Sequence, residues 1–106
     1  MDFYDLDLSD NTLDAIDAMG WTSCTPIQEK CIPEIITGKD VLGIAQTGTG
    51  KTAAYLLPIL SMLDEEDFPE ESINCVIMSP TRELAQQIDQ AMQGFSYYMD
   101  SVSSVA

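Results

Sequence analysis

The stretch that decides the fold of this chain is Ala45-Gln46-Thr47-Gly48-Thr49-Gly50-Lys51-Thr52. A short apolar run, Val41–Ile44, precedes it, and a longer one, Ala53–Leu57, follows it. This order predicts a strand, a loop of small residues and then a helix. Backbone N–H groups of such a loop point at phosphate oxygens, and the positive end of the helix dipole lies beside them. The stretch therefore predicts a phosphate-binding loop and, with it, a nucleotide site.

The common pattern for this loop begins with glycine, where this chain has Ala45. That position ends the predicted strand and needs little volume, so alanine is compatible with it. Gly48 and Gly50 stand where the backbone approaches phosphate closely or takes a positive φ. Lys51 would reach the outer phosphates, and the Thr52 hydroxyl would bind a magnesium ion. The alternative, a glycine-rich turn that only begins a helix, is weaker because strand and helix patterns flank the loop.

Composition excludes several kinds of site. The chain has 106 residues, which bounds it to one domain, and it contains no histidine. Ser-His and Cys-His nucleophile pairs and His-ligated zinc are thereby excluded within it. Its three cysteines lack metal-type spacing and predict reduced thiols in a cytoplasmic protein. The opening residues are acidic, unlike a signal peptide, and no apolar run reaches membrane-spanning length.

The charge of the chain argues against a polyanionic partner. Eighteen acidic side chains face four basic ones, for a net charge of −14. Such a charge repels nucleic acid. Much of the excess lies in the segment up to Asp17 and in the run 64–71, which predicts a solvated loop. A nucleic-acid function must therefore rest on motifs elsewhere in the chain.

The remaining pattern predicts alternating helices and strands. Helices are expected over 10–19, 26–37, 50–63 and 82–98, and strands over 40–45, 73–78 and 101–106. The run 73–78 is apolar throughout, like a strand covered on both faces. Such alternation indicates an α/β fold with a parallel β-sheet flanked by helices. The chain stops in a β-prone run, so we expect a domain truncated within its sheet.

Two further motifs accompany the phosphate loop. Gly20-Trp21-Thr22-Ser23-Cys24-Thr25-Pro26-Ile27-Gln28 lies upstream, and Pro80-Thr81-Arg82-Glu83-Leu84-Ala85 directly follows a predicted strand. In this order and spacing, the three motifs resemble those of the DEAD-box ATP-dependent RNA helicases over nearly the whole chain. The resemblance implies a P-loop NTPase with a RecA-like fold. Residues 1–38 would form its glutamine-motif region, and residues 39–106 would begin its P-loop sheet.

The resemblance also implies roles for single residues. Gln28 would read the adenine edge of ATP, and Phe3 would stack on the adenine ring. Lys51 and Thr52 would act in catalysis, and Thr52 would bind Mg²⁺. The nucleotide would be held by the loop as a whole, that is by Ala45, Gln46, Thr47, Gly48, Thr49, Gly50, Lys51 and Thr52. The RNA sugar–phosphate backbone would contact Pro80, Thr81, Arg82 and Glu83.

The enzyme implied by the resemblance is an ATP hydrolase that remodels or unwinds short RNA duplexes. This chain lacks the Asp-Glu-Ala-Asp motif, the Ser-Ala-Thr motif and a second domain with its arginine finger. Alone, it is therefore expected not to turn over ATP at a useful rate. Cys24 stands where the family usually has proline, and losing a fixed φ there would loosen the approach to the following helix. An unfinished sheet exposes its edge, so we expect the isolated chain to self-associate.

Two alternatives stay open at this point. Another P-loop ATPase or a DNA helicase would share the loop, but Gln28 together with Phe3 argues against it. A non-catalytic module would hold nucleotide or a protein partner without turnover. Single residues also have plainer interpretations: Thr25 and Gln28 have the spacing of a helix-capping pair, and Phe3 could simply pack near a terminus. Trp21 is interpreted as a core or rim residue rather than a base-stacking platform.

Overall fold

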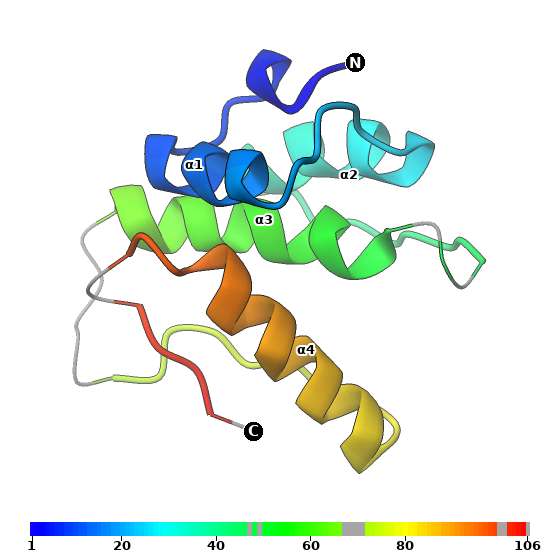
Figure 1. Cartoon of the computed structure of the whole chain (residues 1–106). Helices are drawn as coiled ribbons and strands as arrows, with labels where there is room; N and C mark the ends of the chain where they lie inside the picture. Colours follow the sequence, from blue (N-terminus) through cyan, green and yellow to red (C-terminus); the bar gives the residue numbers. More distant parts are fainter. Residues whose placement is uncertain (47, 49, 67–71, 100–101, 106) are drawn as a thin grey trace.

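The computed structural model describes residues 1–46, 48, 50–66, 72–99 and 102–105. Within these ranges the regular elements are a short 3-10 helix η1 (Phe3–Asp5) and the α-helices α1 (Asp10–Ala18), α2 (Pro26–Ile36), α3 (Lys51–Glu65) and α4 (Arg82–Phe95). Figure 1 shows η1, α1 and α2 on one side of α3 and α4 on the other. The helix that follows the phosphate loop is thus the central element of the molecule.

The sequence explains where the helices begin. The Ser9 side chain accepts a hydrogen bond from the Thr12 N–H (3.3 Å) and caps α1. The Thr81 side chain accepts one from the Leu84 N–H (3.1 Å) and caps α4. Each bond satisfies one of the N–H groups that the first turn of a helix leaves without a partner. The four predicted helices are confirmed, although α4 ends at Phe95, three residues earlier than expected.

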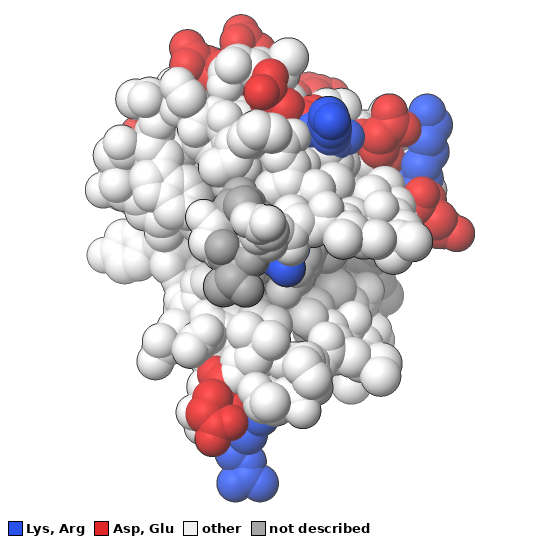
Figure 2. All heavy atoms as spheres, turned by 90° about the vertical axis from the view of Figure 1, so that its right-hand side faces the viewer, with Lys and Arg blue, Asp and Glu red and all other residues white. Residues whose placement is uncertain are grey.

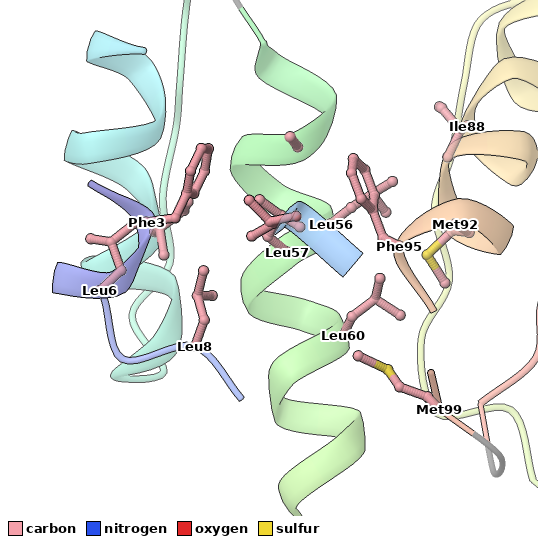
Figure 3. Packing of buried hydrophobic residues seen from close by; sticks show 13 residues of the cluster. Phe3, Leu6, Leu8, Leu56, Leu57, Leu60, Ile88, Met92, Phe95 and Met99 are labelled. Atoms are coloured by element: carbon pink, nitrogen blue, oxygen red, sulfur yellow. The ribbon is translucent and has the colours of Figure 1, made fainter. Parts of the chain in front are cut away.

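The core forms around α3. Leu56, Leu57 and Leu60 of this helix have no exposed surface. Figure 3 shows side chains converging on them from both sides, from Phe3, Leu6 and Leu8 in the N-terminal segment and from Ile88, Met92, Phe95 and Met99 in and after α4. Burying a leucine side chain stabilises the folded state by about 1.5–3 kcal/mol. The helix that follows the phosphate loop is therefore firmly held along its length.

A buried group of hydroxyls ties α1 to α3. The Ser61 hydroxyl accepts a hydrogen bond from the Ser9 N–H (3.1 Å) and donates one to Thr12 Oγ1 (3.0 Å). Ser9 Oγ and Thr12 Oγ1 are 2.8 Å apart, and all three residues are at most 3% exposed. Because each hydroxyl has partners, its burial carries little penalty. The network fixes the register of α1 on the C-terminal half of α3.

The parallel sheet of the predicted α/β fold is not confirmed. In the parts of the chain that the structure describes, the one strand-like pairing is an antiparallel bridge between Asp2 and Ser23. The predicted strands 40–45 and 73–78 are without regular structure, as are residues 102–105 of the third, whose residues 101 and 106 lie outside the described ranges. An apolar run predicts extended backbone, but a strand also needs a neighbouring backbone to donate and accept hydrogen bonds.

The expectation that 73–78 is covered on both faces is wrong for this structure. Ile73, Val76 and Met78 are 86%, 75% and 91% exposed. Such side chains become buried only when other elements pack on them, and sequence periodicity does not say where those elements come from. None of the described helices combines the length and the apolar character needed to cross a membrane.

Candidate nucleotide site

A pocket of about 400 Å³ opens between the N-terminal segment, the start of α2 and the phosphate loop. Its lining comes from both sequence motifs that predict nucleotide binding, and it consists of Phe3, Trp21, Thr22, Ser23, Thr25, Gln28, Gly48 and Gly50. The fold therefore brings the glutamine motif against the phosphate loop, as the sequence predicts.

Gln28 joins these two motifs through a single carboxamide. Its Oε1 accepts a hydrogen bond from the Thr25 N–H (3.0 Å), and its Nε2 donates one to the Gly50 carbonyl (3.2 Å). The residue is 3% exposed. A carboxamide oxygen can accept a second hydrogen bond and its nitrogen can donate a second one. Gln28 is thus a helix cap, and its hydrogen bonds to described residues use one acceptor and one donor position and leave one of each.

Gly50 occupies a position that only glycine fits. Its φ is +81°, in the left-handed region, where residues with a Cβ are strained. A Cβ added there would collide with Gln28 Nε2 and would lie 3.3 Å from Thr25 Oγ1. That Thr25 hydroxyl is buried and has no hydrogen-bond partner among the described residues. A side chain at position 50 would therefore have to displace the Gln28 carboxamide.

Two aromatic residues, Phe3 and Trp21, line the pocket. Phe3 is 1% exposed, and its ring stacks on Trp21 with 6.1 Å between centroids. Trp21 is 39% exposed and also meets the Phe95 ring edge-on at 5.6 Å. Of the two pocket aromatics, Trp21 therefore offers a ligand more ring surface. This half-exposed position against two other rings agrees with the prediction that Trp21 is a core or rim residue.

The phosphate loop leads directly into α3. Lys51 is the first residue of the helix and its side chain is exposed. Gly48 has a φ of +86°, so it also adopts the left-handed conformation. Ala45 is half-buried and Gln46 is exposed, whereas the predicted loop residues Thr47 and Thr49 lie outside the described ranges. The first N–H groups of α3 have no hydrogen-bond partner within the helix, so they can bind an anion at its N-terminus.

Thr52, the predicted magnesium ligand, is half-buried in the first turn of α3. Burial raises the pKa of the Tyr55 hydroxyl, and a hydrogen bond with the Thr52 side chain acts in the opposite direction. Mg²⁺ prefers oxygen ligands and retains water, so a hydroxyl beside phosphate oxygens fits it. No group of three acidic or cysteine side chains that could hold a metal occurs in the described ranges. Thr52 would therefore supply one oxygen ligand to Mg²⁺, and phosphate oxygens and water molecules would supply the others.

The predicted RNA contacts lie apart from this pocket. These residues, Pro80, Thr81, Arg82 and Glu83, are exposed at the start of α4 and do not line the pocket.

Figure 2 shows the face on the right of Figure 1, where acidic side chains gather along the upper rim and the centre is nearly free of them. The negative charge of the chain is thus unevenly spread over this face, so it does not by itself exclude an anionic ligand there.

A larger hollow, of about 590 Å³, lies elsewhere. It separates α4 from the extended segments 72–79 and 102–105, and Asp89 on its wall accepts a hydrogen bond from the Ser104 hydroxyl (2.6 Å). None of the predicted site residues lines it. By volume alone this hollow would be the preferred ligand site, but residues expected to bind a nucleotide line the smaller pocket.

Comparisons with known proteins agree with the motifs. The model of the DEAD/DEAH box helicase family matches residues 25–106. The chain is 46% identical over 104 residues to the ATP-dependent RNA helicase DeaD of Escherichia coli (strain K12), a match that covers 98% of this chain and 16% of that protein. The chain thus spans only a small part of the length of this curated relative.

Solved structures give the same result. A crystal structure of a DEAD box protein from the hyperthermophile Methanococcus jannaschii matches with a TM-score of 0.79 and 36% identity, over 90% of this chain and 25% of that one. The RNA-helicase Prp28 from Chaetomium thermophilum bound to ADP matches with a TM-score of 0.80 and 38% identity, over 93% and 25%. Sequence and fold together show that the chain belongs to the DEAD/DEAH box helicase family.

Proposed function

We propose that this chain is the nucleotide-binding part of an ATP-dependent RNA helicase, an ATP hydrolase that remodels or unwinds short RNA duplexes. The observation that carries the proposal is the carboxamide of Gln28, which joins the glutamine motif to the Gly50 carbonyl in one pocket. The Prp28 relative was solved bound to ADP, which supports nucleotide binding by this chain. The pocket volume of about 400 Å³ lies in the range typical of small-ligand sites.

In this proposal the purine enters between the exposed face of Trp21 and the free edge of Gln28, with Phe3 supporting Trp21 from behind. An amide that offers one donor and one acceptor matches the edge of adenine, which also offers one of each. The phosphates follow the loop 45–52 to Lys51 and to the start of α3. Mg²⁺, held in part by Thr52, would neutralise phosphate charge during phosphoryl transfer.

The RNA-binding part of the proposal rests on the exposed N-terminus of α4. Residues 80–83 combine N–H groups at a helix start with the Arg82 guanidinium, a combination suited to backbone phosphates. We further propose that residues 1–38 form the glutamine-motif region and that 39–106 begin a RecA-like parallel sheet. A cytoplasmic location is consistent with the free thiols of Cys24, Cys31 and Cys75.

The proposal is tested by replacing Gln28 with alanine in the full-length protein. Titration calorimetry with Mg-ADP and Mg-GDP should show that the wild type prefers ADP and that the variant loses this preference by about tenfold or more, because a missing partner leaves base polar groups unpaired. The ratio of the two affinities is informative even if the variant loosens the loop. Gln87→Ala, which alters an exposed glutamine of α4, is the matched control. An unchanged preference in Gln28→Ala would disprove the role of Gln28.

Self-association of the isolated chain is a separate proposal. Leu42, Ile44 and Met78 are 85–91% exposed, and such apolar surface favours contact between molecules. The net charge of −14 opposes contact, so added salt should strengthen the association by screening repulsion. Sedimentation velocity at low and high salt checks this, and a monomer at every salt concentration and at high protein concentration would contradict it.

A further inference from the structure

The first three residues pair with the wall of the nucleotide pocket. The Cys24 N–H donates to the Met1 carbonyl at 2.9 Å, and the Phe3 N–H donates to the Thr22 carbonyl at 3.4 Å. These bonds flank the antiparallel bridge between Asp2 and Ser23. The bond from Cys24 is the shorter one, and by geometry the stronger. Residues 1–3 and 22–24 therefore form one small two-stranded unit.

This unit sets the aromatic side of the pocket. Thr22 and Ser23, the central residues of its second strand, line the pocket themselves. Trp21 directly precedes them and stacks on Phe3, the last paired residue of the first strand. Both partners of the ring contact are thus attached to the two paired strands. Releasing the strands from each other would free the Trp21 ring from one of its two aromatic neighbours.

The identity of residue 24 decides whether the shorter bond exists. Proline has no backbone N–H and could not donate to the Met1 carbonyl. The sequence alone suggested that cysteine in place of the family's usual proline loosens the approach to α2. The structure points the other way, because Cys24 supplies a donor that proline lacks and a partner 2.9 Å away accepts from it. The substitution adds an attachment instead of removing one.

We propose that the backbone N–H of Cys24 is a positioning group for the base of the bound nucleotide. By holding residues 1–3 against 22–24 it fixes the Phe3–Trp21 stack, and so orders the surface on which the purine lies. This inference rests on the proposed nucleotide function. The thiol of Cys24 plays no part in it. The nearby contact between the Met1 amine and Glu29 (3.6 Å) joins partly exposed groups, so it adds little.

The test compares Cys24→Pro with Cys24→Ala in the full-length protein. Proline removes the N–H, whereas alanine removes the thiol and keeps the N–H. The residue before a proline must be extended, and Ser23 already is, because it forms the bridge with Asp2. The proline variant should therefore fold, which circular dichroism and thermal unfolding check.

The affinities for Mg-ADP and for Mg-pyrophosphate separate a positioning effect from general damage. Losing one backbone hydrogen bond should weaken ADP binding by about three- to tenfold in Cys24→Pro. Pyrophosphate has no base, so its affinity should stay unchanged, and Cys24→Ala should match the wild type for both ligands. Equal weakening of both ligands, or no weakening of ADP, would overturn the inference. A Lys51→Ala control shows separately whether ADP uses the proposed site, since failure there would instead overturn the proposed function.

Discussion

Gly50→Ala is expected to abolish measurable Mg-ADP binding and to lower the free energy of unfolding by about 2–4 kcal/mol. Two penalties combine at this position. The φ of +81° strains any residue that has a Cβ, and the added methyl would collide with the Gln28 side chain. Gln28 cannot move aside without losing its bond to the Gly50 carbonyl and its cap of α2. The loop would therefore shift away from the residues proposed to bind the base.

Gly20→Ala is the matched control for this variant. Gly20 also has a left-handed conformation, with a φ of +77°, but a Cβ there would meet no atom within 4 Å. It should cost only the conformational strain, about 1–2 kcal/mol, and leave ADP affinity close to that of the wild type. Urea unfolding and calorimetry on both variants isolate the close approach at Gly50. If the two variants lose equal stability and bind ADP equally, the contact between a Cβ at position 50 and the Gln28 side chain has no effect on folding or binding.

Much of the site could be predicted from sequence because its signals are local. Capping residues, Pro26 at the first position of α2 and the glycines of the phosphate loop each act within a few residues, and their helices are confirmed. Sequence also suggested two roles for Gln28, as a cap and as a reader of the base. The structure shows the cap, and it adds the contact with Gly50, which lies 22 residues away and has no local signal.

The parts that sequence did not predict depend on distant partners. The apolar run 73–78 has the composition of a covered strand, but Ile73 and Met78 are exposed here because nothing in the described ranges packs on them. Trp21 was expected in the core or rim, and its half-exposed position agrees, but its ring contacts with Phe3 and Phe95 depend on tertiary packing that sequence does not show. The pairing of residues 1–3 with 22–24 likewise follows from tertiary packing and not from any motif.

The second large effect is expected for Lys51→Ala, which should weaken Mg-ADP binding by about 10- to 100-fold and remove ATP hydrolysis by the full-length protein. A hydrogen bond to a charged group contributes about 1.5–3 kcal/mol, and in the proposed site Lys51 is the cation that faces the outer phosphates. Its side chain is exposed at the start of α3, so its loss should leave the fold intact.

Lys39→Ala provides the comparison for Lys51→Ala, because it removes the same charge from a side chain that is 66% exposed and pairs with Glu34 at 3.1 Å. A surface pair of this kind contributes little, so affinity and turnover should stay at wild-type values. Lys51→Arg sharpens the comparison: it keeps the charge but not the compact ammonium, and should recover only part of the ADP affinity. Calorimetry with ADP and a phosphate-release assay measure all three variants. If Lys51→Ala behaves like Lys39→Ala, the phosphates do not lie at the start of α3, and the loop that defines this chain has another purpose.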